Sequence, residues 1–223
     1  MAIIVCRGLL FDLDGVLIDS TPAVTRVWSQ WAAEHGLDPA AVTRAAHGRP
    51  SIATIRDYLP GVNAEAENQK VERAELNDLA GVVPLPGATE LLTALPAGSW
   101  NVVTSCTRAL AEVRLRAARL PVPPTMVTAS DVSRGKPDPE PYLKGAASLG
   151  LPATECLVLE DVPAGIHAGK SAGARVAACA TTCPAEELRQ AGADWVVKDC
   201  RSISVHHTAE DRRVTLVLTD GAF

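Results

Sequence analysis

The sequence predicts an α/β protein in which helices cover both faces of a parallel sheet, with an all-helical segment inserted after the first strand. Two observations carry this prediction. From residue 87 onwards, apolar runs of strand length alternate with segments of helical periodicity, which is typical of parallel βαβ units. Residues 20–82, in contrast, have apolar residues at helical spacing and no convincing strand.

The first part of the chain contains one strand and the helical insert, which we define as residues 20–82. Residues 3–11 predict a strand that is interrupted at Arg7 and Gly8. Ser20 and Pro22 are typical of a helix start, and Gly36 of its end. Further helices are expected over residues 38–46, from residue 51 with Ser51 as its N-cap, and over 65–79. Residues 83–87 are rich in proline and predict a hinge-like connector.

The rest of the chain supplies the remaining elements of the α/β core, so that the core comprises residues 1–19 and 83–223 and the insert forms a second domain. Helices are predicted over residues 88–95, 108–120, 140–149, 164–172 and 184–191. Strands are predicted over residues 100–104, 125–129, 156–159, 175–179 and 194–197, with a possible edge strand over 213–218.

Composition excludes several classes of protein. The 223 residues are 47% hydrophobic and carry a net charge of −5, which gives no basic footprint for nucleic acid. The chain has no apolar run of about 18 residues, so we expect no membrane span. The N-terminus reaches charged residues too early for a signal peptide. Six scattered cysteines without a C-x-x-C pair indicate reduced thiols. We therefore expect a cytoplasmic protein.

Two carboxylates follow the first apolar strand. Asp12 and Asp14 lie two positions apart and are followed at once by Gly15. Because side chains alternate along an extended chain, the two carboxylates are expected to converge at the end of the strand. Buried acids of this kind need neutralising, and Mg²⁺ takes oxygen ligands from one or two carboxylates together with substrate phosphate. Taken alone, such a pattern is more often a plain polar turn after a strand, but three further segments downstream favour the Mg²⁺ site.

Three further segments place polar side chains where the same site would lie. The hydroxyls of Thr104 and Ser105 end an apolar strand just before a helix, where an anionic oxygen is easily bound. Lys136 stands on a loop stiffened by prolines and can supply a fixed positive charge. Glu160 and Asp161 end another buried strand and can complete a carboxylate cage for a cation. Ligands of open α/β sheets bind beyond the carboxyl ends of the strands, where all these residues fall.

The four segments, in this order, resemble the haloacid dehalogenase superfamily of Mg²⁺-dependent phosphohydrolases. The motifs are D-x-D-G, an apolar run ending in T-S, G-K-P, and E-D-x-x-A-G-I, and the resemblance extends to about residue 198. It implies a Rossmann-like core with a parallel sheet, and it implies that the helical insert is the α-helical cap of that superfamily. H-G-R-P at residues 47–50 and T-S-C-T at 104–107 are similar to the phosphatases of small sugar and polyol phosphates, close to β-phosphoglucomutase.

The resemblance also implies roles for the motif residues. Asp12 would be the nucleophile that forms an aspartyl-phosphate, and Asp14 would protonate the leaving alkoxide and then activate water. Mg²⁺ would be held by Asp12, the backbone carbonyl of Asp14 and Asp161, with Glu160 as a direct or water-mediated ligand. Lys136 would neutralise the phosphoryl oxygens together with the cation.

Substrate binding is expected from a second set of residues. Either Thr104 or Ser105 would hold a phosphate oxygen, since both align with the motif. Gly15 would allow the phosphate to approach the backbone. Arg49 in the insert is the best candidate for a substrate contact, because a guanidinium can clamp a phosphate or sugar hydroxyls, and His47 is a second.

The leading hypothesis is thus hydrolysis of a small phosphomonoester, a sugar or polyol phosphate, by a monomer or weak dimer. A mutase that moves phosphate within one sugar would use the same four motifs. A non-catalytic protein that senses phosphate is a more remote alternative, since all the catalytic residues of the motifs are present.

Overall fold

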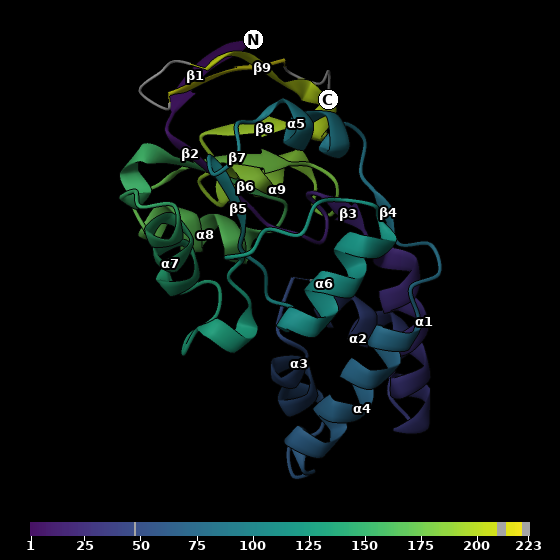
Figure 1. Ribbon diagram of the computed structural model, residues 1–223. Coiled ribbons are helices and arrows are strands. Elements are labelled where there is room, and N and C mark those ends of the chain that lie inside the picture. The colour runs from purple at the N-terminus through teal and green to yellow at the C-terminus, as the bar shows by residue number, and fades with distance from the viewer. Residues whose placement is uncertain (47, 209–212, 220–223) are drawn as a thin grey trace.

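The computed structural model describes residues 1–46, 48–208 and 213–219 (Figure 1). Its centre is a five-stranded sheet of parallel strands in the order β5-β2-β6-β7-β8. These strands are β2 (Gly8–Phe11), β5 (Trp100–Val102), β6 (Cys156–Glu160), β7 (Arg175–Cys179) and β8 (Trp195–Val197). The fully buried, almost continuously apolar sequences of β2 and β6 suit strands that are covered on both faces.

Helices lie on both faces of this sheet, as the alternation of the sequence predicted. Leu9 and Phe11 of β2 point into one apolar cluster, whereas Leu10 between them points into a second. The first cluster includes residues of α5 (Ala88–Ala94) and α6 (Arg108–Ala117). The second includes residues of α7 (Glu140–Ser148), α8 (Pro163–Ser171) and α9 (Ala185–Gln190). The predicted α/β fold class is therefore confirmed.

The helical insert contains four helices with an apolar cluster of their own. They are α1 (Thr21–Glu34), α2 (Pro39–Ala46), α3 (Ser51–Tyr58) and α4 (Ala64–Asn77). The chain enters the insert through β3 (Ile18–Asp19) and leaves it through β4 (Val83–Pro84), and these two short strands pair antiparallel. Figure 1 shows the four helices grouped below the sheet, with α4 in contact with α6. The division into two domains at residues 20–82 stays a prediction, which this separate cluster supports.

A second, antiparallel sheet carries both ends of the described chain (Figure 1). Its order is β1 (Ala2–Cys6), β10 (Val214–Leu218) and β9 (Ile203–Thr208). The predicted first strand is thus divided at Arg7 between two sheets. The prediction of an edge strand near the C-terminus was wrong, because β10 pairs with a strand on each side. The side chains of β10 are buried at alternate positions, as in a strand, but this alternation does not show which strands lie beside it.

Two other local predictions were also wrong. Residues 125–129 form no strand but one bridge, between Val127 and Val103. The side chains of Thr128 and Asp131 then cap a short 3₁₀ helix (Ala129–Asp131), which ends the pairing. Ser51 does not cap α3, because Pro50 is the N-cap residue and the Ser51 hydroxyl donates to Asn68 Oδ1 instead. Two further 3₁₀ helices cover Ala153–Glu155 and Cys200–Ser202.

Candidate active site

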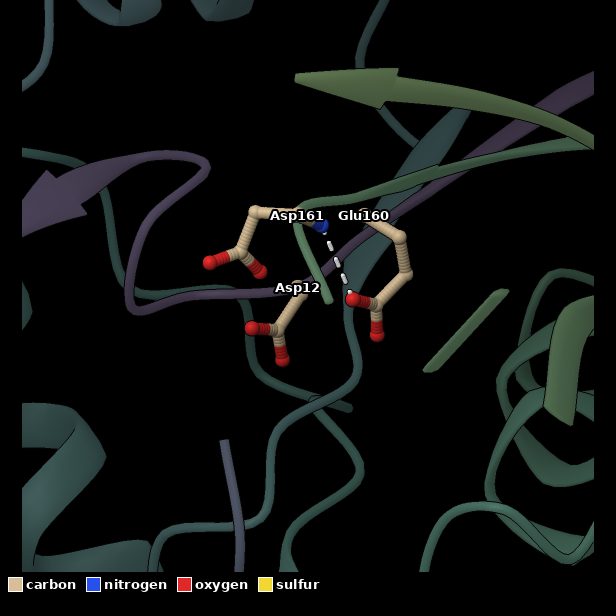
Figure 2. Close-up of side chains that lie close together, drawn as sticks. All are labelled: Asp12, Glu160 and Asp161. Atoms are coloured by element: carbon tan, nitrogen blue, oxygen red, sulfur yellow. Dashed lines mark hydrogen bonds between the residues drawn. The ribbon is translucent and has the colours of Figure 1, made fainter. Parts of the chain in front are cut away.

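Three carboxylates meet at the carboxyl ends of the two central strands, β2 and β6. Asp12 follows β2 directly, and Glu160 and Asp161 stand at the end of β6. Figure 2 shows the three side chains grouped together, and one oxygen of each lies within 4.8 Å of the others. All three residues are buried, with exposed fractions of 5%, 0% and 2%. Neighbouring parallel strands therefore bring together acids that are far apart in the sequence, as the motifs predicted.

Lys136 inserts its ammonium group between these acids. Its Nζ donates to Asp12 Oδ1 at 2.6 Å, to Glu160 Oε1 at 2.7 Å and to the carbonyl oxygen of Val103 at 3.1 Å. The loop that carries Lys136 is fastened by Glu140, whose carboxylate accepts the backbone amides of residues 133 and 134. The lysine is thus a fixed charge, held in place from both ends of its side chain.

One ammonium does not neutralise three buried carboxylates. Burial, together with the charge of Glu160, raises the pKa of Asp12 to about 7 against the opposing effect of Lys136. Burial, together with the charges of Glu160 and Asp12, raises the pKa of Asp161 well above its usual range. Asp161 Oδ1 is also buried without a hydrogen-bond partner among the described residues. An orphaned carboxylate oxygen beside Asp12 fits the oxygen-rich ligand set that Mg²⁺ prefers.

Glu160 differs from the other two acids because both of its oxygens are already engaged. Oε1 accepts from Lys136 and from the Tyr142 hydroxyl at 2.7 Å. Oε2 accepts from the backbone amides of Asp161 and Val162 at 3.0 and 3.4 Å. This arrangement orients Lys136 and is better suited to a water-mediated contact with a cation than to direct ligation.

Gly15 makes room for one of these acids. Its φ of +84° lies in the left-handed region, and a Cβ at this position would overlap the carboxylate of Asp161. The sequence predicted a glycine that allows phosphate to approach the backbone. The structure gives a second reason for the glycine, and the first stays a prediction.

The Asp14 carboxylate is not part of the three-acid cluster and is held by other donors. Its Oδ1 accepts from Ser20 Oγ at 2.5 Å and from Arg114 Nη1 at 3.0 Å, and its Oδ2 accepts from Cys106 Sγ at 3.1 Å. The Asp14 side chain remains 21% exposed. Asp12 and Asp14 nevertheless line the same pocket, so a single bound substrate can contact both.

This pocket lies between the sheet and the helical insert. The sheet side contributes Thr104 and Ser105, and both of their hydroxyls are already in hydrogen bonds. Thr104 Oγ1 accepts the amide of Cys106 at 3.1 Å, and Ser105 Oγ donates to the carbonyl oxygen of Gly48 at 3.4 Å. The choice between these two hydroxyls as the phosphate ligand therefore stays open.

The insert side of the pocket carries polar side chains among apolar ones. Arg49 lines it and pairs with Asp57 at 2.8 Å, while His47 lies outside the described residues. Ser51 donates to Asn68 Oδ1 at 2.5 Å, and Asn68 Nδ2 donates to Glu72 Oε1 at 2.8 Å. This chain of hydroxyl, amide and carboxylate presents hydrogen-bonding groups to whatever the pocket holds.

Sequence reasoning missed two buried charges at this site, Arg114 on α6 and Glu75 on α4. Arg114 Nη2 lies 3.3 Å from Glu75 Oε1, and both residues line the pocket. One signal was available, since Arg114 falls on the same face of its helix as the apolar Leu110 and Ala111. A charge on an apolar face is a candidate for a buried ion pair.

Comparisons with known proteins agree with this geometry. Residues 6–173 match the family of haloacid dehalogenase-like hydrolases. The chain is 42% identical over 205 residues to hexitol phosphatase A of Escherichia coli, covering 90% of this chain and 94% of that protein. It is 37% identical to glycerol-1-phosphate phosphohydrolase 1 of Saccharomyces cerevisiae, covering 96% and 91%.

A solved hydrolase from Pseudomonas syringae has a similar fold, with a TM-score of 0.78 and 28% identity over 88% of this chain and 94% of its own. Among the described residues, no helix combines the length and hydropathy that a membrane span requires. The family resemblance of the four motifs is confirmed, and so is the expectation of a hydrolase. The chain belongs to the haloacid dehalogenase-like hydrolases.

Proposed function

We propose that this chain is a Mg²⁺-dependent phosphatase that hydrolyses a small sugar or polyol phosphate through an aspartyl-phosphate on Asp12. The observation that carries the proposal is the position of Asp12 in the pocket, between the ammonium group of Lys136 and the orphaned oxygen of Asp161. A carboxylate held there can attack a phosphoryl group whose negative charge is balanced by Lys136 on one side and, when Mg²⁺ is bound, by the cation on the other.

The proposed reaction has two steps. A carboxylate oxygen of Asp12 attacks phosphorus, and the bond from phosphorus to the substrate oxygen breaks while Asp14 gives a proton to that oxygen. Asp14, now ionised, takes a proton from water as the water attacks the phosphorus of the aspartyl-phosphate and the bond from phosphorus to the Asp12 oxygen breaks. Inorganic phosphate leaves, and Asp12 and Asp14 return to their starting states.

The charged groups around Asp12 would have different roles in this reaction. Lys136 neutralises phosphoryl oxygens and weakens their repulsion of the nucleophile. Mg²⁺, when held by Asp12, the backbone carbonyl of Asp14 and Asp161, would supply further positive charge to the phosphoryl oxygens. Glu160 would keep Lys136 in place and meet the cation through water, since its own oxygens accept from four protein donors.

The pocket favours a substrate that is neutral and rich in hydroxyls beyond its phosphate. The described cations that line it, Arg49 and Arg114, both pair with carboxylates of the protein. Asn68 and Glu72 offer hydrogen bonds to hydroxyl groups, but Glu72 would repel a second phosphate or a carboxylate. The names of the two relatives, a hexitol phosphatase and a glycerol-phosphate phosphohydrolase, support a polyol phosphate.

The direct test is phosphate release from a panel of polyol phosphates, sugar phosphates and phosphoglycolate, with Mg²⁺ or with EDTA. We expect release from a polyol or sugar phosphate with Mg²⁺ and none with EDTA. Interconversion of hexose 1- and 6-phosphates in the presence of a bisphosphate primer, without release, would identify a mutase instead. Silence in both assays would contradict the proposal and favour the non-catalytic alternative.

Asn68 tests the substrate class. Asn68→Ala is expected to raise KM for a polyol phosphate about tenfold, the effect of one or two lost hydrogen bonds. KM for p-nitrophenyl phosphate, which has no hydroxyl beyond its phosphate, should change little. Gln69→Ala, at the neighbouring exposed position of α4, is the matched control. An equal rise in KM for both substrates would show that Asn68 does not recognise the polyol.

A further inference from the structure

We infer that Arg114, anchored by Glu75 of the helical insert, is a positioning residue that holds the Asp14 carboxylate where it can protonate the leaving group. This inference rests on the proposed function and adds two residues to it. It also makes the placement of the acid depend on how α4 of the insert lies against α6 of the core.

The guanidinium of Arg114 lies at the centre of a buried cluster. Its Nη1 is 3.0 Å from Asp14 Oδ1 and 3.2 Å from Cys106 Sγ, and its Nη2 is 3.3 Å from Glu75 Oε1. The side chains of Arg114 and Glu75 are only 4% and 8% exposed. One planar, rigid group thus contacts a carboxylate of the core and a carboxylate of the insert.

Stability alone does not account for a charge at this position. Arg114 stands on the face of α6 that buries Leu110, Ala111 and Leu115. Removing two opposite charges from water costs so much that a well-packed apolar side chain is often at least as stable as a buried ion pair. The Nε of Arg114 is in addition buried without a partner among the described residues. An arginine that is costly in this way is best explained by what it does to Asp14.

The effect on Asp14 is to fix the direction of its carboxylate. Ser20 and Arg114 hold one oxygen, and Cys106 holds the other. A general acid has to lie within hydrogen-bonding distance of the oxygen that it protonates, and small displacements cost large factors in rate. Without Arg114 the carboxylate loses its only charged partner in this set of donors.

Glu75 fixes the guanidinium from the opposite side. Because Glu75 is on α4, the distance between Arg114 and Asp14 is correct only when the insert is packed against α6 as it is here. Protonation of the leaving group is therefore linked to the packing of the insert against α6. Removal of Glu75 should act through Arg114 and not independently of it.

Leaving groups of different quality test this role. The value of kcat/KM reports only the steps up to formation of the aspartyl-phosphate, and a polyol leaving group needs a proton there whereas p-nitrophenolate does not. We expect Arg114→Gln to lower kcat/KM for a polyol phosphate about 100-fold, which is a typical size for general acid catalysis. The same variant should lower kcat/KM for p-nitrophenyl phosphate less than about threefold. Arg116→Gln is the matched control, because Arg116 is exposed on the same helix and pairs with Glu112.

Two further variants keep the test decisive if Arg114→Gln does not fold. Arg114→Lys should recover part of the polyol activity, and Glu75→Gln should lower it about tenfold with p-nitrophenyl phosphate again spared. The double variant of Arg114→Gln and Glu75→Gln should be no more selective between the two substrates than Arg114→Gln alone. If Arg114→Gln does not fold, Arg114→Lys takes its place in both the single and the double variant. Equal losses on both substrates would show a purely structural role and overturn the inference. A wild-type protein that hydrolyses neither substrate would instead overturn the proposed function.

Discussion

Asp12→Asn is expected to abolish phosphate release, with a residual rate below about one ten-thousandth of the wild-type rate. An amide has the shape of the carboxylate but cannot attack phosphorus, so the aspartyl-phosphate cannot form. Phosphate release with saturating Mg²⁺ and polyol phosphate measures the effect. The melting temperature of the variant shows whether the protein remains folded.

The matched control is Asp38→Asn in the insert, an exposed aspartate whose side-chain oxygen accepts the amide of Ala40. Asparagine keeps that oxygen, so this variant should retain full activity. An Asp12→Asn protein with more than a small fraction of wild-type turnover would remove Asp12 from the role of nucleophile. Unchanged binding of a partner in an inactive protein would favour the phosphate-sensing alternative.

Lys136→Met is expected to damage both stability and turnover. The variant leaves Asp12 and Glu160 buried without their cation, and breaking a buried ion pair in this way costs about 3–5 kcal/mol. Turnover should fall about 100-fold or more, because one preorganised charge next to the phosphoryl group is lost. Urea unfolding in EDTA measures the first effect, and phosphate release with Mg²⁺ measures the second.

Mg²⁺ separates this explanation from a simple packing defect. A cation bound by Asp12 and Asp161 would offset part of the charge that Lys136 supplied, so Mg²⁺ should stabilise the variant more than the wild-type protein. Lys170→Met is the control, since Lys170 forms a half-exposed pair with Asp194 at 2.7 Å and such pairs contribute at most about 1 kcal/mol. Equal stabilisation of both proteins by Mg²⁺ would contradict a shared site for the lysine and the cation.

Much of the fold was predictable because its signals are local. The apolar runs of β2, β6 and β7 are bounded by acids or loops. The bounds of β7 are those that the sequence predicted, and α2 begins one residue later than predicted. The wrong predictions depend on distant partners. Whether β10 is an edge or a central strand is decided by its pairing with β1, at the opposite end of the chain.

The residues of the candidate site also differ in whether a local sequence signal predicts them. The three acids and Lys136 each follow a strand or stand on a stiff loop, so short local motifs are enough to single them out, although their roles stay predictions. Arg114 and Arg116 belong to the same helix, yet one side chain is 4% exposed and the other 64%. The apolar face of α6 marks Arg114 as a candidate for burial, but only the packing of α4 against α6 shows that its partners are Glu75 and Asp14.

The most direct test of the account is to trap the phosphoryl group on Asp12. In an Asp14→Asn protein mixed with p-nitrophenyl phosphate and Mg²⁺, the first step needs no proton, whereas the second lacks the base that activates water. The account predicts a burst of about one nitrophenol per chain, and a phosphoryl group on the peptide that contains residue 12 after acid quenching. Steady release without a burst, or a phosphoryl group on any other residue, would contradict it.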